Sequence, residues 1–162
     1  MAAGATYTPI ATTTLSSAQA SVTFSSISGS YTDLFIVMAL EPGSSLDGIR
    51  LRFNSDTGSN YSWTQLYGGA STGSNRGSNQ DNIPVGATSA NERQMSTFSI
   101  NNYSNSTTYK TVLVSPRGAT TYASAIVGLW RNTNAITSLS ISVASNTMAA
   151  NSTFTIYGIA AA

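Results

Sequence analysis

The sequence has no cysteine, no histidine and only one lysine among its 162 residues. Most catalysis at neutral pH uses histidine, cysteine, lysine or clustered carboxylates as nucleophile, acid or base. Without cysteine, disulfides and thiolate metal sites are also excluded. Charged residues make up only 8% of the chain, against about 25% in an average globular protein. We therefore expect a protein that is not an enzyme and that holds no metal ion and no cofactor.

Low charge also limits the partners of this protein. Its net charge of +1 is too small for nucleic acid, whose affinity for proteins comes mainly from Lys and Arg. The longest apolar run, residues 34–40, is much shorter than a membrane span. Residues 1–7 lack the basic and apolar segments of a signal peptide. Neither nucleic acid nor a membrane is therefore expected as a partner.

Uncharged polar residues dominate what the chain does contain. Serine, threonine and asparagine occur 27, 22 and 13 times. A surface of hydroxyls and amides can keep a weakly charged protein in solution. The alternative is that low charge serves association, because copies with little charge do not repel one another.

The apolar pattern predicts an all-β chain of about ten strands. Residues 49–53 and 139–143 alternate apolar and polar side chains, which is typical of half-buried strands. Residues 34–40 and 125–130 are short continuous apolar runs, which favour fully buried strands. Further strands are expected at residues 6–15, 22–24, 61–67, 95–100, 109–115 and 153–159. The best helix candidate, residues 89–95, is short.

Strands at this spacing predict a single-domain, two-sheet β-sandwich, and a jelly roll suits a chain of this length best. An immunoglobulin-like sandwich is the alternative, although its cysteine pair is missing. Residues 1–14 are expected to form an N-terminal arm or an edge strand, and residues 15–162 the sandwich. Residues 68–81 are rich in glycine, serine and asparagine and predict a long loop, which is functional or mobile.

Three sets of residues are candidates for a metal-binding or catalytic site. Residues 54–58 (Asn-Ser-Asp-Thr-Gly) space oxygen ligands as a calcium loop does, but they offer one carboxylate, so a tight turn is the better interpretation. A Ser–Lys catalytic pair would need Lys110, for which a solvated strand position is expected. A glycosidase pair could come from the six acids, but no two can be singled out: Asp33, Glu41, Asp47, Asp56, Asp81 and Glu92.

The aromatic residues suggest either a core or a sugar-binding shelf. Tyr61 and Trp63 share one face of a strand, Tyr67 closes that strand, and Trp130 ends another. We expect the two tryptophans in the core, because large rings bury large areas in sandwich interiors.

Arginine outnumbers lysine six to one, which favours contacts with a protein partner over simple solubility. Arg50 and Arg52 point to one side of a strand, whereas the remaining arginines fall in or beside turns. The polar N-terminal segment could add a strand to the edge of a partner's sheet. The candidate partner-contact residues are therefore Tyr7, Pro9, Arg50, Arg52, Arg76 and Arg93.

Residues 52–62 (Arg-Phe-Asn-Ser-Asp-Thr-Gly-Ser-Asn-Tyr-Ser), followed by Leu66-Tyr67-Gly68, resemble a run in uncharacterised virion proteins of tailed bacteriophages, many of them from cyanobacterial and marine viruses. Residues 24–27, 31–34, 126–130 and 155–159 match the same pattern, so the resemblance extends from about residue 21 to residue 159.

The resemblance implies a structural protein of a phage particle with no catalytic residues. Such domains look like capsid decoration (cement) proteins in some phages and like tail or fibre modules in others. A cement protein would be made in the host cytoplasm, sit on the outer surface of the head as a homotrimer, and bind the major capsid protein. It would stabilise the head by bridging capsomers through many modest contacts. The alternative is a tail or fibre receptor-binding module that recognises host surface glycans.

Overall fold

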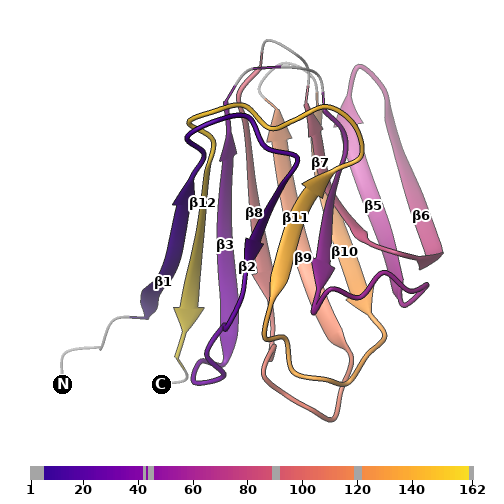
Figure 1. The fold of residues 1–162 in the computed structure, drawn as a ribbon. Coiled ribbons are helices and arrows are strands. Elements are labelled where there is room, and N and C mark those ends of the chain that lie inside the picture. The colour runs from indigo at the N-terminus through magenta and orange to yellow at the C-terminus, as the bar shows by residue number, and fades with distance from the viewer. Residues whose placement is uncertain (1–5, 42, 44–45, 89–91, 119–121, 161–162) are drawn as a thin grey trace.

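The computed structural model describes residues 6–41, 43, 46–88, 92–118 and 122–160 and contains no helix among them. These residues form two antiparallel sheets that face each other (Figure 1). The expected all-β, two-sheet sandwich is therefore confirmed. No helix that could cross a membrane is found in the described part of the chain.

Twelve strands lie in the described part of the chain. They are β1 (Tyr7–Thr14), β2 (Ser21–Phe24), β3 (Asp33–Leu40), β4 (Leu46–Phe53), β5 (Tyr61–Gly69), β6 (Thr72–Gln80), β7 (Ile83–Thr88), β8 (Gln94–Ile100), β9 (Lys110–Gly118), β10 (Tyr122–Trp130), β11 (Leu139–Val143) and β12 (Thr153–Ile159). The larger sheet has eight strands in the order β1-β12-β3-β8-β9-β10-β5-β6, and the smaller has four in the order β2-β11-β4-β7.

The core lies between the two sheets and follows the two-residue period of the strands. In β3, Leu34, Ile36, Met38 and Leu40 point inward and are almost completely buried, while the residues between them are half-buried. Alternate apolar residues of β4 and β11 face them from the smaller sheet. Burying each such side chain contributes about 1.5–3 kcal/mol, so the alternation fixes which face of each strand is inside.

The N-terminal segment forms strand β1 at one edge of the larger sheet, where it pairs with β12. Its register shifts between Pro9 and Ala11. Proline and bulges are devices that protect an exposed sheet edge from unwanted pairing.

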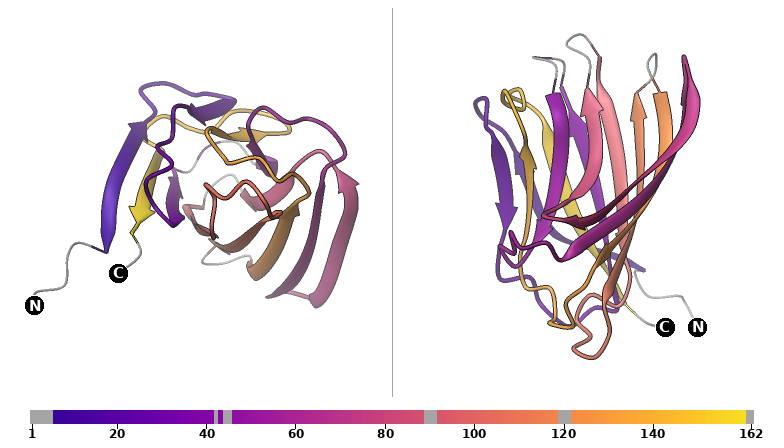
Figure 2. Two further views of the ribbon diagram at one scale, coloured as in Figure 1. Left: turned by 90° about the horizontal axis from the view of Figure 1, so that it is seen from below. Right: turned by 90° about the vertical axis from the view of Figure 1, so that its right-hand side faces the viewer.

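The prediction of a long loop at residues 68–81 is wrong, because this segment forms the other edge of the larger sheet. Most of this segment is strand β6, which forms a hairpin with β5 and projects beyond the smaller sheet (Figures 1 and 2). A Cβ atom at Gly77 would lie 2.7 Å from the ring of Trp63, and one at Gly73 would lie 2.7 Å from the hydroxyl of Tyr67. The rings of β5 therefore cover the glycines of β6, and this pairing replaces the apolar pattern that a strand usually shows.

Two smaller predictions also differ from the structure. Strand β7 was not expected, because Pro84 and Gly86 interrupt its short apolar pattern. The helix considered for residues 89–95 is wrong at its end, since Gln94 and Met95 begin strand β8. Residues 89–91 lie outside the described residues.

Candidate functional site

The side chains that point away from the core on the eight-stranded sheet form one continuous surface, which we call the outer face. The strand registers place these side chains in rows that run across the sheet. One row crosses all eight strands: Pro9, Tyr157, Phe35, Ser99, Leu113, Val127, Thr64 and Arg76. The outer face is therefore built from residues far apart in the sequence.

Charge is confined to the border of the outer face. Among the described side chains of its strands, Asp33 lies at one end of β3 and Arg76 on the edge strand β6. Just beyond the strand ends, Arg93 donates to the Glu41 carboxylate at 2.8–2.9 Å. The centre of the face consists of hydroxyl and apolar side chains.

Large apolar side chains are exposed at this centre. Leu113 and Val127 lie directly opposite each other on β9 and β10, and each is about half exposed (50% and 51%). Leu66 on β5 is 62% exposed and pairs with Ala125 of β10. Single exposed apolar residues are ordinary, but neighbouring ones on a sheet form a patch of the kind found at interaction sites.

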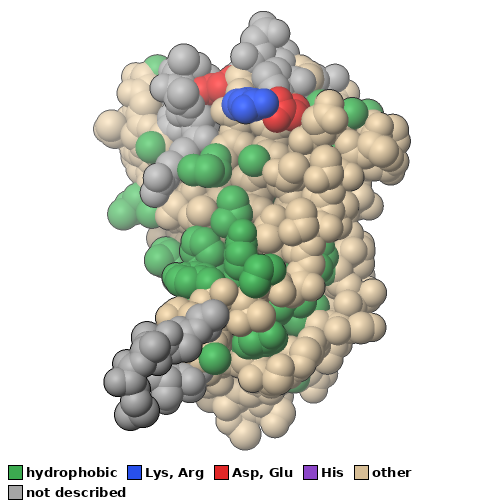
Figure 3. Space-filling view, turned by 90° about the vertical axis from the view of Figure 1, so that its left-hand side faces the viewer, with side chains coloured by type: hydrophobic (Ala, Val, Ile, Leu, Met, Phe, Trp, Pro, Cys, Tyr) green, Lys and Arg blue, Asp and Glu red, His purple; other side chains and the backbone are tan. Residues whose placement is uncertain are grey.

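A second apolar group lies toward the β1 edge of the outer face. The ring of Tyr7 makes edge contacts with Phe35 and Tyr157, with ring centres 5.7 and 6.3 Å apart. Figure 3 views the side of the molecule where β1 and β12 lie. Hydrophobic side chains gather across its middle, and the coloured charged groups lie only near the upper end.

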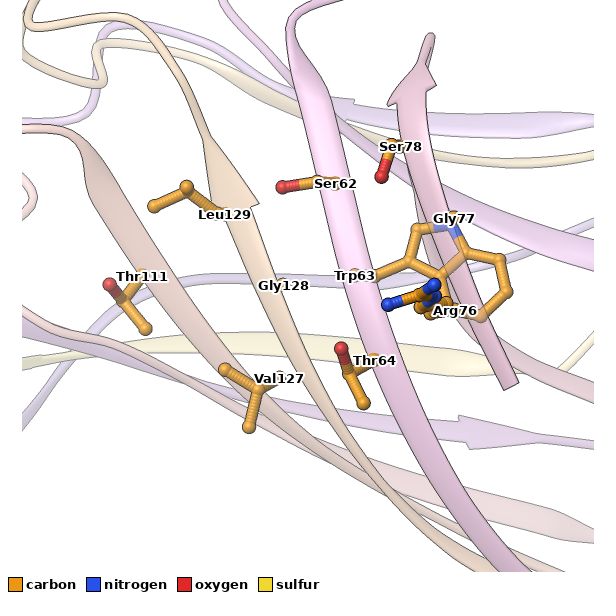
Figure 4. A pocket seen from close by; sticks show the side chains of 10 residues that line it. All are labelled: Ser62, Trp63, Thr64, Arg76, Gly77, Ser78, Thr111, Val127, Gly128 and Leu129. Atoms are coloured by element: carbon orange, nitrogen blue, oxygen red, sulfur yellow. The ribbon is translucent and has the colours of Figure 1, made fainter. Parts of the chain in front are cut away.

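A hollow of about 440 Å³ opens on the outer face over β9, β10, β5 and β6. Figure 4 shows the side chains of Ser62, Thr64, Thr111 and Val127 projecting from three neighbouring strands, with Arg76 on the fourth. No acceptor among the described residues lies within hydrogen-bond distance of the Arg76 guanidinium, and this side chain is exposed. The hollow thus offers hydroxyls, a small apolar surface and one cation.

The six candidate partner-contact residues do not form one site. Tyr7, Pro9 and Arg76 lie on the outer face, at its two opposite edges, and Arg93 lies at its border. Arg50 and Arg52 point the same way from β4, as expected, but on the outside of the smaller sheet. The exposed Leu66, Leu113 and Val127 were missed. The sequence carries a signal only for Val127, which takes an outward position in the apolar run 125–130.

Arg52 is held by an ion pair with Asp81. Its Nε donates to the Asp81 carbonyl oxygen at 2.9 Å, and its terminal nitrogen contacts the Asp81 carboxylate. Burial raises the pKa of Asp81, but hydrogen bonds from Asn82 and Arg52 lower it more, so this pKa is below its ordinary value.

The turn predicted at residues 54–58 is confirmed. Asn54 and Ser55 have positive φ angles of 49° and 57°, a conformation suited to tight turns. The Asp56 carboxylate accepts hydrogen bonds from the Gly58 amide at 2.8 Å and from the Trp130 indole at 2.7 Å. Asp56 therefore joins this turn to the core.

The six acidic residues are candidates for a glycosidase pair, and Asp56 alone is a candidate calcium ligand. Asp33 accepts a hydrogen bond from the Asn102 amide, and Glu41 pairs with Arg93. The described part of the chain contains no group of three acidic side chains that could hold a metal ion. The side chain of Asp47 lies outside what is described.

Lys110 was expected to be a solvated strand residue. This prediction is wrong, because its side chain is completely buried. Its Nζ donates to the carbonyl oxygens of Thr108 at 2.7 Å and Thr133 at 3.0 Å, and burial lowers its pKa. Val112 and Val114 face the core on the same strand, and the two-residue period places Lys110 on their side. This signal reveals the burial of Lys110 only once the inner face of the strand is known.

The prediction that both tryptophans lie in the core is confirmed for Trp130 and only partly for Trp63. Trp130 is buried and stacks on Tyr61, with ring centres 6.4 Å apart, while Trp63 is half-buried against the core. The Tyr61 hydroxyl accepts a hydrogen bond from the Phe53 amide, and burial raises the pKa of Tyr61 to about 12.

No family model matches this sequence, and neither does any curated protein. Among solved structures, a protein of unknown function from Shewanella oneidensis MR-1 is similar, with a TM-score of 0.24 and 7% identity. The match covers 100% of this chain and 82% of that one. A likeness this weak carries no argument, so the function must be inferred from this chain's own residues and geometry.

Proposed function

We propose that this protein is a structural protein of a tailed bacteriophage particle, which decorates the outside of the head and stabilises it. The observation that carries the proposal is the outer face, a sheet eight strands wide whose centre exposes hydroxyl and apolar groups without charge. Such a surface suits adhesion to proteins, because few charges lose their hydration when it is covered. The resemblance of residues 21–159 to phage virion proteins supports the same class.

A bridging protein needs more than one contact surface, and the sandwich offers two on opposite sides. The outer face is one. The other is the outside of the smaller sheet, where β4 presents Arg50 beside Arg52, which is already paired with Asp81. The planar fork of arginine suits carboxylates and backbone carbonyls of a partner such as the major capsid protein. Many copies of a modest two-sided contact would resist outward pressure on the shell.

The proposal is tested by counting copies of the protein in separated heads and tails of the phage that encodes it. Many copies on heads, together with a higher rupture temperature when purified protein is added back to bare heads, would support it. A few copies confined to the tail would rule out decoration.

The hollow on the outer face favours a second candidate function, in which a tail or fibre module recognises host glycans. Hydroxyls of Ser62, Thr64 and Thr111 can exchange hydrogen bonds with sugar hydroxyls, and Arg76 can pair with the carboxylate of an acidic sugar. A glycan array tests this candidate with the wild type and with Arg76→Ala. Binding of acidic glycans that Arg76→Ala loses would support it, and no binding to host polysaccharides would exclude it.

A further inference from the structure

We infer that the outer face is the surface through which copies of this chain associate with one another. The inference adds a partner, a second copy of this chain, to the proposed function. It rests on the proposed function only in placing the assembly on the outside of a phage head. Its basis is the face itself: how large it is, which chemistry a partner must offer, and how two such faces fit together.

The outer face is large enough for a stable interface. Eight strands spaced about 4.8 Å apart give a width of about 34 Å, and strands of this length run about 25 Å. The product, about 850 Å², is close to the roughly 800 Å² that each partner buries in a standard interface.

The chemistry of the face calls for a partner that is also uncharged at its centre. A charged partner would lose hydration against Leu113, Val127 and Leu66 without gaining an opposite charge. The same face of a second copy meets this requirement. In a two-fold contact each copy presents the same patch, so self-complementarity is sufficient. Such a contact pairs two copies and differs from the homotrimer that the resemblance implies.

The alternation of large and small side chains on the outer face also suits packing against the same face of a second copy. The large side chains of Leu66 and Leu113 lie directly opposite the small side chains of Ala125 and Ser99 in their own rows. Two twisted sheets pack face to face about 10 Å apart when large side chains of one enter the gaps between those of the other. Asp33 and Arg76 at separate borders give the rim charges of both signs.

The test is the mass of the purified protein in solution, measured by size-exclusion chromatography with light scattering. The wild type is expected to have a mass of at least twice 16.8 kDa. Leu113→Glu and Val127→Glu place like charges in the contact and should weaken association about 100-fold or more. Both side chains are half exposed, so the variants should keep the circular dichroism spectrum and melting temperature of the monomer fold.

Thr23→Glu is the matched control, because Thr23 is exposed on β2 and points away from the core on the smaller sheet. It should leave the mass unchanged. A monomeric wild type, or an oligomer that survives both outer-face substitutions, would overturn the inference. A monomer that still decorates heads would leave the proposed function intact, whereas an oligomer absent from heads would contradict the proposed function alone.

Discussion

Among single side chains, Asp56 connects the turn at residues 54–58 to the core through the Trp130 indole. We expect Asp56→Ala to lower the free energy of unfolding by about 1.5–3 kcal/mol, because hydrogen bonds to a charged acceptor are lost. Chemical denaturation measures this change. Thr57→Ala, at an exposed position in the same turn, is the control and should cost much less. Equal losses in the two variants would argue against this role of Asp56.

Asp56 should also make the free energy of unfolding depend on pH in the acidic range. Burial raises its pKa, but hydrogen bonds from Trp130, Asn60 and Gly58 lower it more, so the folded-state pKa lies below the ordinary value. The unfolded chain therefore takes up the proton first as pH falls. The stabilisation is present above the unfolded pKa of about 3.9 and is lost as pH falls through the folded pKa. Melting temperatures of Asp56→Asn should depend less on pH in this range than those of the wild type.

Gln94 is a buried side chain whose polar atoms find no hydrogen-bond partner among the described residues. We expect Gln94→Met to raise the free energy of unfolding by about 1–3 kcal/mol, because it removes unsatisfied groups at nearly constant volume. Gln65→Met is the control, since the Gln65 amide donates to Ser124 at 3.2 Å, and it should be neutral or destabilising. A lower melting temperature for Gln94→Met would contradict this account of the core.

Lys110 should be protected from chemical modification by its burial. An amine-acetylating reagent should leave Lys110 unmodified in the folded protein and modify it after denaturation in guanidinium. Peptide mass spectrometry locates the acetyl group. Rapid acetylation of Lys110 in the folded state would restore the solvated position that the sequence suggested.

Among the strands, β6 depends on the rings of β5 rather than on apolar residues of its own. A methyl group at Gly77 would collide with the Trp63 indole. Gly77→Ala should therefore change the tryptophan fluorescence and destabilise the protein by about 1–3 kcal/mol. Ser74→Ala, on an exposed position of the same strand, should do neither. Unchanged fluorescence in Gly77→Ala would show that Trp63 does not cover β6.

Strands with an apolar pattern could be predicted from the sequence, and strands without one could not. β3 and β12 were expected within a residue of their bounds, because a buried face needs alternating or continuous apolar residues. β6 has no such pattern, since its stability comes from its neighbour. β7 is short and interrupted by Pro84 and Gly86.

The outer face shows a similar limit of sequence-based prediction. Its edge residues Tyr7 and Arg76 were singled out, but nothing in the sequence places them on one surface. Their relation depends on the strand order, which brings β1, β12 and β3 together from the two ends of the chain. Sequence alone also could not separate exposed Leu113 from its buried neighbours Val112 and Val114 without the strand's orientation.

As a whole, the molecule is a two-layer sandwich with one surface that is uncharged at its centre and an arginine-bearing surface on the other side. We propose that this shape acts by adhesion on the outside of a phage head. An electron cryomicroscopy reconstruction of the particle that carries the protein tests this claim most directly. We expect the sandwich at repeated positions on the outer head surface, where it bridges neighbouring capsomers. Density for it only on the tail, or nowhere on the particle, would contradict the claim.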